Sequence, residues 1–164
     1  MSTRPDLRFM LRNPMHLLAL GGGSGLSPIA PGTMGTLLAA PLFLVLMQTP
    51  EMAHYAIIAG LFLIGIPACG LTGKHLGVAD HGSIVWDEIV AFMLVLEFAP
   101  LSWQWWLTAF LLFRLFDIWK PFPISYFDAR LKGGFGVMFD DLLAAVYAVA
   151  CMKGLQWWML NSSI

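Results

Sequence analysis

Charged residues are scarce in this sequence of 164 residues. Only 12% of the residues are Asp, Glu, Lys or Arg, whereas 59% are hydrophobic. In soluble domains about 25% of the residues are charged and about 45–50% are apolar. The net charge of −1 lacks the basic surplus that a nucleic-acid-binding face needs, so no nucleic-acid partner is expected. The length suits a single domain. The composition therefore predicts one membrane-embedded domain over residues 1–164.

Several common functional motifs are also missing. Cys69 and Cys151 form no CxxC pair and lie in apolar runs, so both are expected to be buried and to bind no metal. No cleavable signal peptide is expected at the N-terminus. The glycine-rich residues 21–33 contain no Walker, Rossmann or nucleophile-elbow motif. These absences argue against a P-loop, a dinucleotide-binding or a serine-hydrolase site.

Five apolar segments predict an all-α fold. They cover residues 34–47, 55–71, 84–98, 103–119 and 139–158. A membrane span needs about 20 apolar residues, with a lower limit of about 17, so the first and third segments are short. We therefore expect a compact multi-span integral membrane bundle. The glycine- and proline-rich residues 21–33 cannot form a regular lipid-facing helix, and we expect a re-entrant or interfacial loop there.

The basic residues indicate how the bundle is oriented. Most of them lie near the N-terminus or in loops on one side of the predicted bundle: Arg4, Arg8, Arg12, Lys74, Lys120, Arg130 and Lys132. Basic residues favour the cytoplasmic side of a membrane. Residues 1–14 are therefore expected to be a cytoplasmic lead-in, and the tryptophans in residues 103–106 and 157–158 to form an outer aromatic belt.

Acidic residues gather at the cytoplasmic ends of the last three segments. Asp87 and Glu88 open the third segment and Asp117 closes the fourth. Asp140 and Asp141 open the fifth. Antiparallel helices bring these ends together, and the carboxylates would then repel one another unless a cation lies between them. A site with only oxygen ligands suits Mg²⁺. The helix dipole alone explains acids at helix starts, but it disfavours Asp117 at a helix end.

Basic residues close to these acids indicate a phosphate-bearing substrate. Arg114, Lys120 and Lys132 are the basic residues expected to hold its phosphate oxygens, together with a bound metal. A zinc site is not expected, because His75 and His81 are the only imidazoles near the acids and no cysteine is close.

Two glycine-rich stretches offer further donors to a phosphate. In residues 21–33 the expected substrate-binding groups are the hydroxyls of Ser27 and Thr33 and the backbone of Gly32. A hinge that lets the chain re-enter the bundle is the alternative explanation of this stretch. A second glycine loop, at residues 133–136, would let the backbone approach a ligand closely.

Four motifs resemble those of the phosphatidylglycerophosphatase A family, and they occur in the family order between residues 13 and 147. They are Gly25-Leu26-Ser27-Pro28 with Pro31-Gly32-Thr33, residues 80–88 (DHGSIVWDE), residues 113–121 (FRLFDIWKP) and residues 133–141 (GGFGVMFDD). The resemblance implies a bacterial inner-membrane, all-helical, Mg²⁺-dependent enzyme. Such an enzyme removes the terminal phosphate of phosphatidylglycerophosphate and leaves phosphatidylglycerol.

The residues and the resemblance together define a hypothesis for the site. The expected metal ligands are Asp87, Glu88, Asp117, Asp140 and Asp141. The expected catalytic residues are Asp80, His81, Asp87, Glu88 and Asp141. Within this set, Asp80 or His81 is expected to act as general base or to protonate the leaving glycerol oxygen. The expected partners are the lipid substrate and membrane lipid, and the sequence leaves the oligomeric state open.

Two other functions fit parts of the pattern. Acids inside a membrane also mark divalent-cation or proton transporters, although here they lie at one face instead of along a path through the bilayer. A CDP-alcohol phosphatidyltransferase is also a multi-span protein with clustered acids, but its signature is absent and residues 128–130 match it only faintly. Ion flux in proteoliposomes tests the first alternative, and release of CMP instead of phosphate tests the second.

Overall fold

Helices make up all of the regular structure in residues 4–162, the part of the chain that the structure describes. The computed structural model contains α1 (Leu7–Leu11), α2 (Pro14–Ala19), the 3-10 helix η1 (Gly21–Leu26), α3 (Pro31–Leu46), α4 (Glu51–Leu76), α5 (Trp86–Glu97), α6 (Trp103–Trp119), α7 (Ile124–Arg130) and α8 (Gly133–Asn161). The prediction of an all-α fold is confirmed. The five predicted apolar segments correspond to α3, α4, α5, α6 and α8.

Helix length separates these five helices into two groups. Among the described residues, α4 with 26 residues and α8 with 29 are long and apolar enough to cross a membrane. The other three are shorter, with 16 residues in α3, 12 in α5 and 17 in α6. A bundle of five full spans is therefore not confirmed by helix length.

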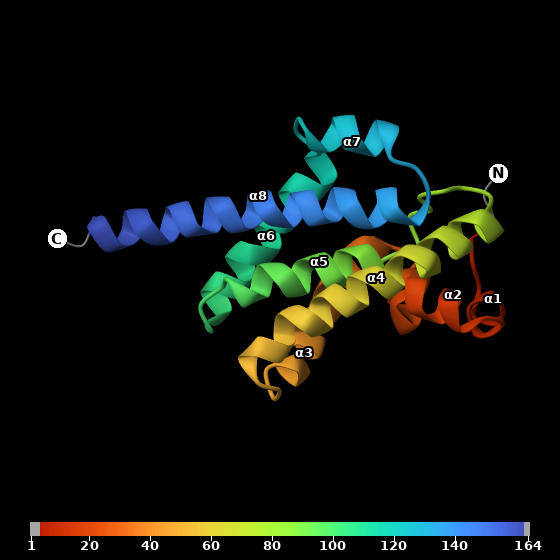
Figure 1. Cartoon of the computed structure of the whole chain (residues 1–164), viewed down its shortest axis with the longest axis horizontal. Helices are drawn as coiled ribbons and strands as arrows, with labels where there is room; N and C mark the ends of the chain where they lie inside the picture. Colours follow the sequence, from red (N-terminus) through yellow and green to blue (C-terminus); the bar gives the residue numbers. More distant parts are fainter. Residues whose placement is uncertain (1–3, 163–164) are drawn as a thin grey trace.

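The short helix α5 lies at the centre of the fold (Figure 1). It packs against α3, α4, α6 and α8, and nine of its 12 residues are buried. A helix that is apolar on all sides must be covered on all sides. Because the neighbouring helices cover α5, it does not have to be long enough to span the membrane in contact with lipid. The long helix α8 packs against α5 and also against α4, α6 and α7. The start of α5 is thereby held beside the N-terminal part of α8.

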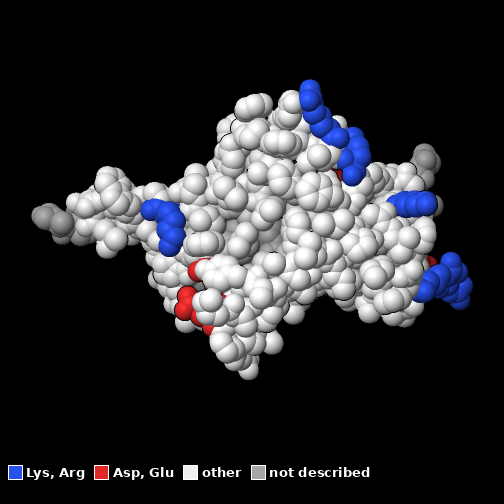
Figure 2. All heavy atoms as spheres, in the orientation of Figure 1, with Lys and Arg blue, Asp and Glu red and all other residues white. Residues whose placement is uncertain are grey.

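The outer helices carry large exposed apolar side chains. Examples are Leu37 and Val45 on α3, Leu63 on α4, Leu111 on α6 and Leu160 on α8. Figure 2 shows a wide surface without charged side chains, and the Lys and Arg residues lie mainly on the half that contains α1, α2 and α7. Soluble monomers rarely expose contiguous apolar patches larger than a few hundred Å². These faces are typical of contact with lipid.

The two cysteines lie in different environments. Cys69 on α4 is buried, as predicted, whereas Cys151 on α8 is exposed. The prediction for Cys151 is wrong because its side of α8 faces away from the other helices, while the adjacent Met152 faces into the core. An apolar run alone does not reveal which side of a helix is covered.

The helices α4 and α8 approach closely at glycine residues. A Cβ atom on Gly134 would lie 1.8 Å from the backbone oxygen of Ile66 and 2.7 Å from the backbone nitrogen of Gly70. Small residues allow such close contact between helix backbones. The prediction of a glycine loop at residues 133–136 is therefore wrong: these residues form the first turn of α8, and Gly134 allows α8 to pack against α4.

Gly134→Ala is expected to lower the thermal stability of the purified protein in detergent, because the added methyl group meets the fixed backbone of α4. Overpacking of this kind costs about 1–3 kcal/mol. Gly154→Ala is the matched control on the same helix, since a Cβ there would meet no atom of another helix within 4 Å, and it is expected to be neutral or stabilising. Thermal unfolding measures both; equal melting temperatures for the two variants would contradict the packing argument.

Candidate active site

The loop before α5 is fixed in place by the N-terminal helices. Val85 donates its backbone N–H to the oxygen of Ala19 at 2.9 Å. A Cβ atom on Gly25 would lie 2.1 Å from the backbone oxygen of Ser83, so η1 packs directly against the loop. Three successive glycines at the start of η1 have positive φ angles, which glycine adopts without strain. The glycine-rich stretch therefore positions the loop and the start of α5.

A cavity of about 310 Å³ lies where α5, α6 and α8 meet the start of α3. We call it the acidic cavity. Its lining residues are Ala30, Pro31, Gly32, Asp80, Gly82, Ile84, Asp87, Glu88, Arg114, Asp117, Ile118, Lys120, Asp140 and Asp141. The structure thus brings all the predicted metal ligands into one cavity, together with one of the predicted proton-transfer residues and two of the predicted phosphate-binding cations.

Arg114 connects two of the acids in this cavity. Its Nη1 atom lies 2.8 Å from Oε1 of Glu88 and 2.6 Å from Oδ2 of Asp117. The three side chains are largely buried, and hydrogen bonds between ionised groups are about twice as strong as neutral ones. Arg114 therefore links α5 to α6 and offsets the repulsion between the two carboxylates.

Lys120 connects a second pair of acids. Its Nζ atom lies 3.0 Å from Oδ1 of Asp128 and also donates to Asp140. Burial alone would lower the pKa of Lys120, but the hydrogen bonds and charges of the two aspartates outweigh burial and raise the pKa above its ordinary value. Lys120 is also one of two non-glycine residues in the described chain with positive φ, at 45°, an uncommon conformation for such a residue.

Three carboxylate oxygens of the acidic cavity are buried and have no hydrogen-bond partner among the described residues. They are Oδ1 of Asp87, Oε2 of Glu88 and Oδ2 of Asp141. Asp87 and Asp141 are only 6% and 4% exposed. An unpaired buried charge is costly, so these oxygens require a further cation or a proton. Oxygen donors without sulfur or imidazole are the ligands that Mg²⁺ prefers, and the residues therefore fit a divalent metal.

The helix α3 begins directly against Glu88. A Cβ atom on Gly32 would lie 2.0 Å from Oε1 of Glu88, and one on Gly35 would lie 2.7 Å from Cβ of Val85. Glycine at these two positions is what allows α3 to approach α5. The positive end of the α3 dipole then lies near a carboxylate, which it stabilises.

Comparison with known proteins agrees with this arrangement of motifs. The family model described as phosphatidylglycerophosphatase A matches residues 17–156. The chain belongs to the phosphatidylglycerophosphatase A family. All the residues of the acidic cavity lie within the matched range.

Three proteins are similar to this chain over most of its length. A Haemophilus influenzae protein named phosphatidylglycerophosphatase A is 52% identical over 158 residues, which are 95% of this chain and 97% of that protein. An Escherichia coli protein of the same name is 44% identical over 153 residues, 92% of this chain and 89% of that protein. A Bacteroides thetaiotaomicron protein, provisionally named phosphatidylinositol-3-phosphatase, is 38% identical over 149 residues, 86% of this chain and 92% of that protein. No solved structure matches the chain.

Four of the site residues predicted for this family member lie outside the acidic cavity. Ser27 donates its hydroxyl to the backbone oxygen two residues further on, at 2.7 Å. Lys132 donates to the backbone oxygen of Asp128 at 3.3 Å. His81 lines a neighbouring cavity, and Thr33 is not among the residues that line the acidic cavity. The structure therefore places these four side chains outside the acidic cavity, although Ser27 and His81 line a neighbouring cavity that Asp80 also lines.

Asp128 is a candidate site residue that sequence reasoning missed. One oxygen each of Asp80, Asp128 and Asp140 lies within 4.8 Å of the others, a spacing suitable for a metal ion. Asp128 lies on the short helix α7, where polar residues are ordinary. No specific sequence signal distinguishes it, because its role depends on how α7 folds back against α8.

Proposed function

We propose that this chain is a Mg²⁺-dependent lipid phosphatase that hydrolyses phosphatidylglycerophosphate to phosphatidylglycerol and phosphate at the cytoplasmic face of the bacterial inner membrane. The observation that carries the proposal is the acidic cavity. It combines buried carboxylate oxygens without partners and two cations, in a chain whose relatives bear the name of this activity.

The proposed metal ligands are the carboxylates of the acidic cavity: Asp87, Glu88, Asp117, Asp140 and Asp141. Asp80 and Asp128 supply further oxygens beside Asp140. A bound Mg²⁺ supplies a Lewis acid for the phosphoryl oxygens and lowers the pKa of a bound water. The three unpartnered oxygens of Asp87, Glu88 and Asp141 support this assignment.

The cations Arg114 and Lys120 would bind the phosphate of the substrate. Arg114 makes both of its ion pairs through Nη1, and its buried Nε atom has no hydrogen-bond partner among the described residues. The planar guanidinium of Arg114 suits two oxygens of one phosphate. Asp80, which lies on the loop before α5 and lines the cavity, is positioned to exchange a proton with the attacking water or the leaving glycerol oxygen.

The membrane placement rests on the distribution of apolar and basic residues. The helices α4 and α8 are long enough to cross a bilayer, and the exposed apolar faces of the other helices suit acyl chains. The Lys and Arg residues lie mainly on the half of the molecule with α1, α2 and α7 (Figure 2). Because cytoplasmic segments are rich in basic residues, we propose that this half and the acidic cavity face the cytoplasm.

The decisive assay measures phosphate released by the purified protein from phosphatidylglycerophosphate, phosphatidic acid and lysophosphatidic acid, with Mg²⁺ and with EDTA. We expect rapid release from phosphatidylglycerophosphate, slower release from the other two lipids, and loss of all activity with EDTA. Undiminished activity in EDTA would reject the metal. Absence of phosphate release from phosphatidylglycerophosphate would reject the proposed substrate.

One relative suggests a second substrate to include in this assay. The name of the Bacteroides protein points to an inositol lipid that also carries a phosphate monoester. Phosphatidylinositol 3-phosphate is therefore the appropriate fourth lipid. The two relatives named for phosphatidylglycerophosphate are more similar to this chain, so we expect the glycerol-containing lipid to be preferred.

A further inference from the structure

A second cavity adjoins the acidic cavity and has a different chemistry. Its volume is about 460 Å³, and its lining residues are Arg4, Pro5, Leu26, Ser27, Pro28, Pro31, Val78, Asp80, His81, Gly82 and Ser83. We call it the N-terminal cavity. Pro31, Asp80 and Gly82 line both cavities, so the two are neighbours across the loop that precedes α5.

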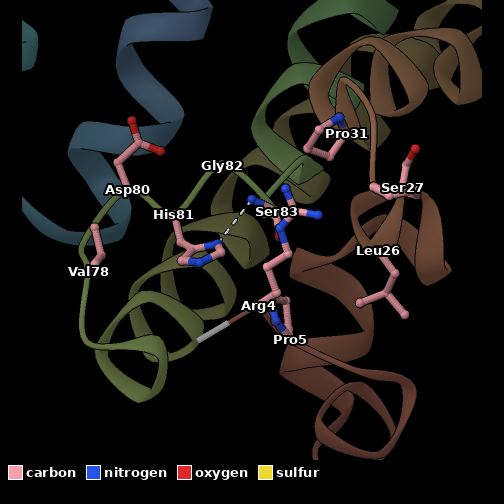
Figure 3. A pocket seen from close by; sticks show the side chains of 11 residues that line it. Arg4, Pro5, Leu26, Ser27, Pro31, Val78, Asp80, His81, Gly82 and Ser83 are labelled. Atoms are coloured by element: carbon pink, nitrogen blue, oxygen red, sulfur yellow. Dashed lines mark hydrogen bonds between the residues drawn. The ribbon is translucent and has the colours of Figure 1, made fainter. Parts of the chain in front are cut away.

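Arg4 supplies the N-terminal cavity with an uncommitted positive charge. Figure 3 shows its side chain extending from the N-terminal segment toward Gly82 and Ser83. Unlike Arg114 and Lys120, Arg4 forms no ion pair with any of residues 4–162. An unpaired guanidinium in a cavity is a suitable donor for a phosphate.

His81 supplies a second donor to the same cavity. Its Nδ1 atom accepts a hydrogen bond from the backbone N–H of Ser83 at 3.2 Å. Because Nδ1 is the acceptor, the neutral ring must carry its proton on Nε2, where it makes no hydrogen bond with another described residue. His81 is only 9% exposed. This geometry gives His81 a fixed N–H donor and no free acceptor.

The carboxylate of Asp80 does not cancel these donors. Figure 3 shows it turned away from Arg4 and Ser83. Its oxygen instead lies within 4.8 Å of oxygens of Asp128 and Asp140. The wall between the two cavities therefore presents acid to one side and donors to the other, so the N-terminal cavity suits an anion and does not suit a metal ion.

We infer that the N-terminal cavity binds the phosphodiester of the substrate, with Arg4 and His81 as its donors, while the terminal phosphate lies in the acidic cavity. This inference rests on the proposed function, because phosphatidylglycerophosphate carries two phosphates joined by one glycerol. Two adjoining cavities with separate cations match two linked phosphates. Arg4 and His81 are then specificity-determining residues, since a lipid with a single phosphate leaves them without a partner.

Binding of glycerophosphoglycerol tests the inference without any hydrolysis. This soluble molecule has the phosphodiester but no terminal phosphate, and EDTA in the buffer removes metal from the acidic cavity. Isothermal titration of the full chain in detergent is expected to show binding that Arg4→Gln weakens by about ten- to a hundred-fold, the usual effect of losing a charged hydrogen bond. Arg8→Gln is the matched control, because Arg8 lies on the same N-terminal segment but outside this cavity.

The outcomes separate the subsite from the proposed function. Equal binding by the parent and Arg4→Gln would overturn the subsite, and so would equal weakening in Arg4→Gln and Arg8→Gln, which would indicate only general charge attraction. Phosphate release by the parent protein from phosphatidylglycerophosphate is measured in parallel. If the parent binds the diester through Arg4 but releases no phosphate, the subsite stands and the proposed reaction fails. If it releases phosphate but binding does not depend on Arg4, the proposed reaction stands and the subsite fails.

Discussion

Asp141→Asn is expected to reduce phosphate release from phosphatidylglycerophosphate by more than about 100-fold, because loss of even an outer partner of a metal site costs about 10–100-fold. Asp141 is almost fully buried and has an oxygen with no partner. The neutral amide removes a ligand charge but keeps the shape of the side chain. We expect the Mg²⁺ concentration for half-maximal activity to rise in the same assay.

The same substitution should raise the thermal stability of the metal-free protein. A buried carboxylate without a partner destabilises the fold, so its replacement by an amide relieves a cost at the same time as it removes activity. Loss of activity with a gain in stability distinguishes a metal ligand from a residue that merely supports the fold. Asp87→Asn should behave alike, since Asp87 is equally buried.

Glu51→Gln is the control for this experiment. Glu51 is exposed at the start of α4 and lies outside the acidic cavity. The activity and the metal requirement of Glu51→Gln should therefore equal those of the parent. Near-normal activity in both Asp141→Asn and Asp87→Asn would show that these acids hold no metal. A fall in the stability of the metal-free variants would show that their carboxylates are paired in a way the structure does not show.

The location of the acids could be predicted from the sequence because it depends on helix order alone. Successive antiparallel helices place Asp87, Asp117 and Asp140 at the same end, whatever the detailed packing. The helices themselves could be predicted because each apolar run must be buried away from water, in the protein core or in lipid. Those two features require no knowledge of side-chain contacts.

The pairing of the acids could not be predicted, because it depends on the rotation of each helix. The sequence places Arg114 close to Asp117, but it does not show that the same guanidinium reaches Glu88 on another helix. Asp128 was missed for the same reason, since only the fold of α7 brings it to Lys120.

The glycines were the least predictable part of the sequence. A glycine-rich stretch suggests a flexible loop or a phosphate cradle, yet Gly25 and Gly32 are needed because neighbouring atoms leave no room for a Cβ atom. The same holds for Gly134 in the predicted second loop. Close backbone contacts involve partners far away in the chain, and a local pattern does not reveal them.

Arg114→Gln is expected to lower turnover by about 100-fold or more, comparable to the loss of one donor from a site that stabilises developing negative charge. Unlike Asp141→Asn, it should reduce the Mg²⁺ concentration needed for half-maximal activity. Glu88 and Asp117 lose their shared cation in this variant, so their negative charge attracts a metal ion more strongly. Opposite shifts of the metal requirement in the two variants would be difficult to explain by misfolding.

Two further variants make this result interpretable. Arg114→Lys keeps the charge but loses the planar fork, so its turnover should lie between those of the parent and Arg114→Gln, with little change in the metal requirement. Lys153→Gln is the control cation, because Lys153 is exposed on α8 and, among residues 4–162, donates a hydrogen bond only to Gln156. An unchanged or increased metal requirement in Arg114→Gln would show that Glu88 and Asp117 do not hold the metal, and the ligand set would then reduce to Asp87, Asp140 and Asp141.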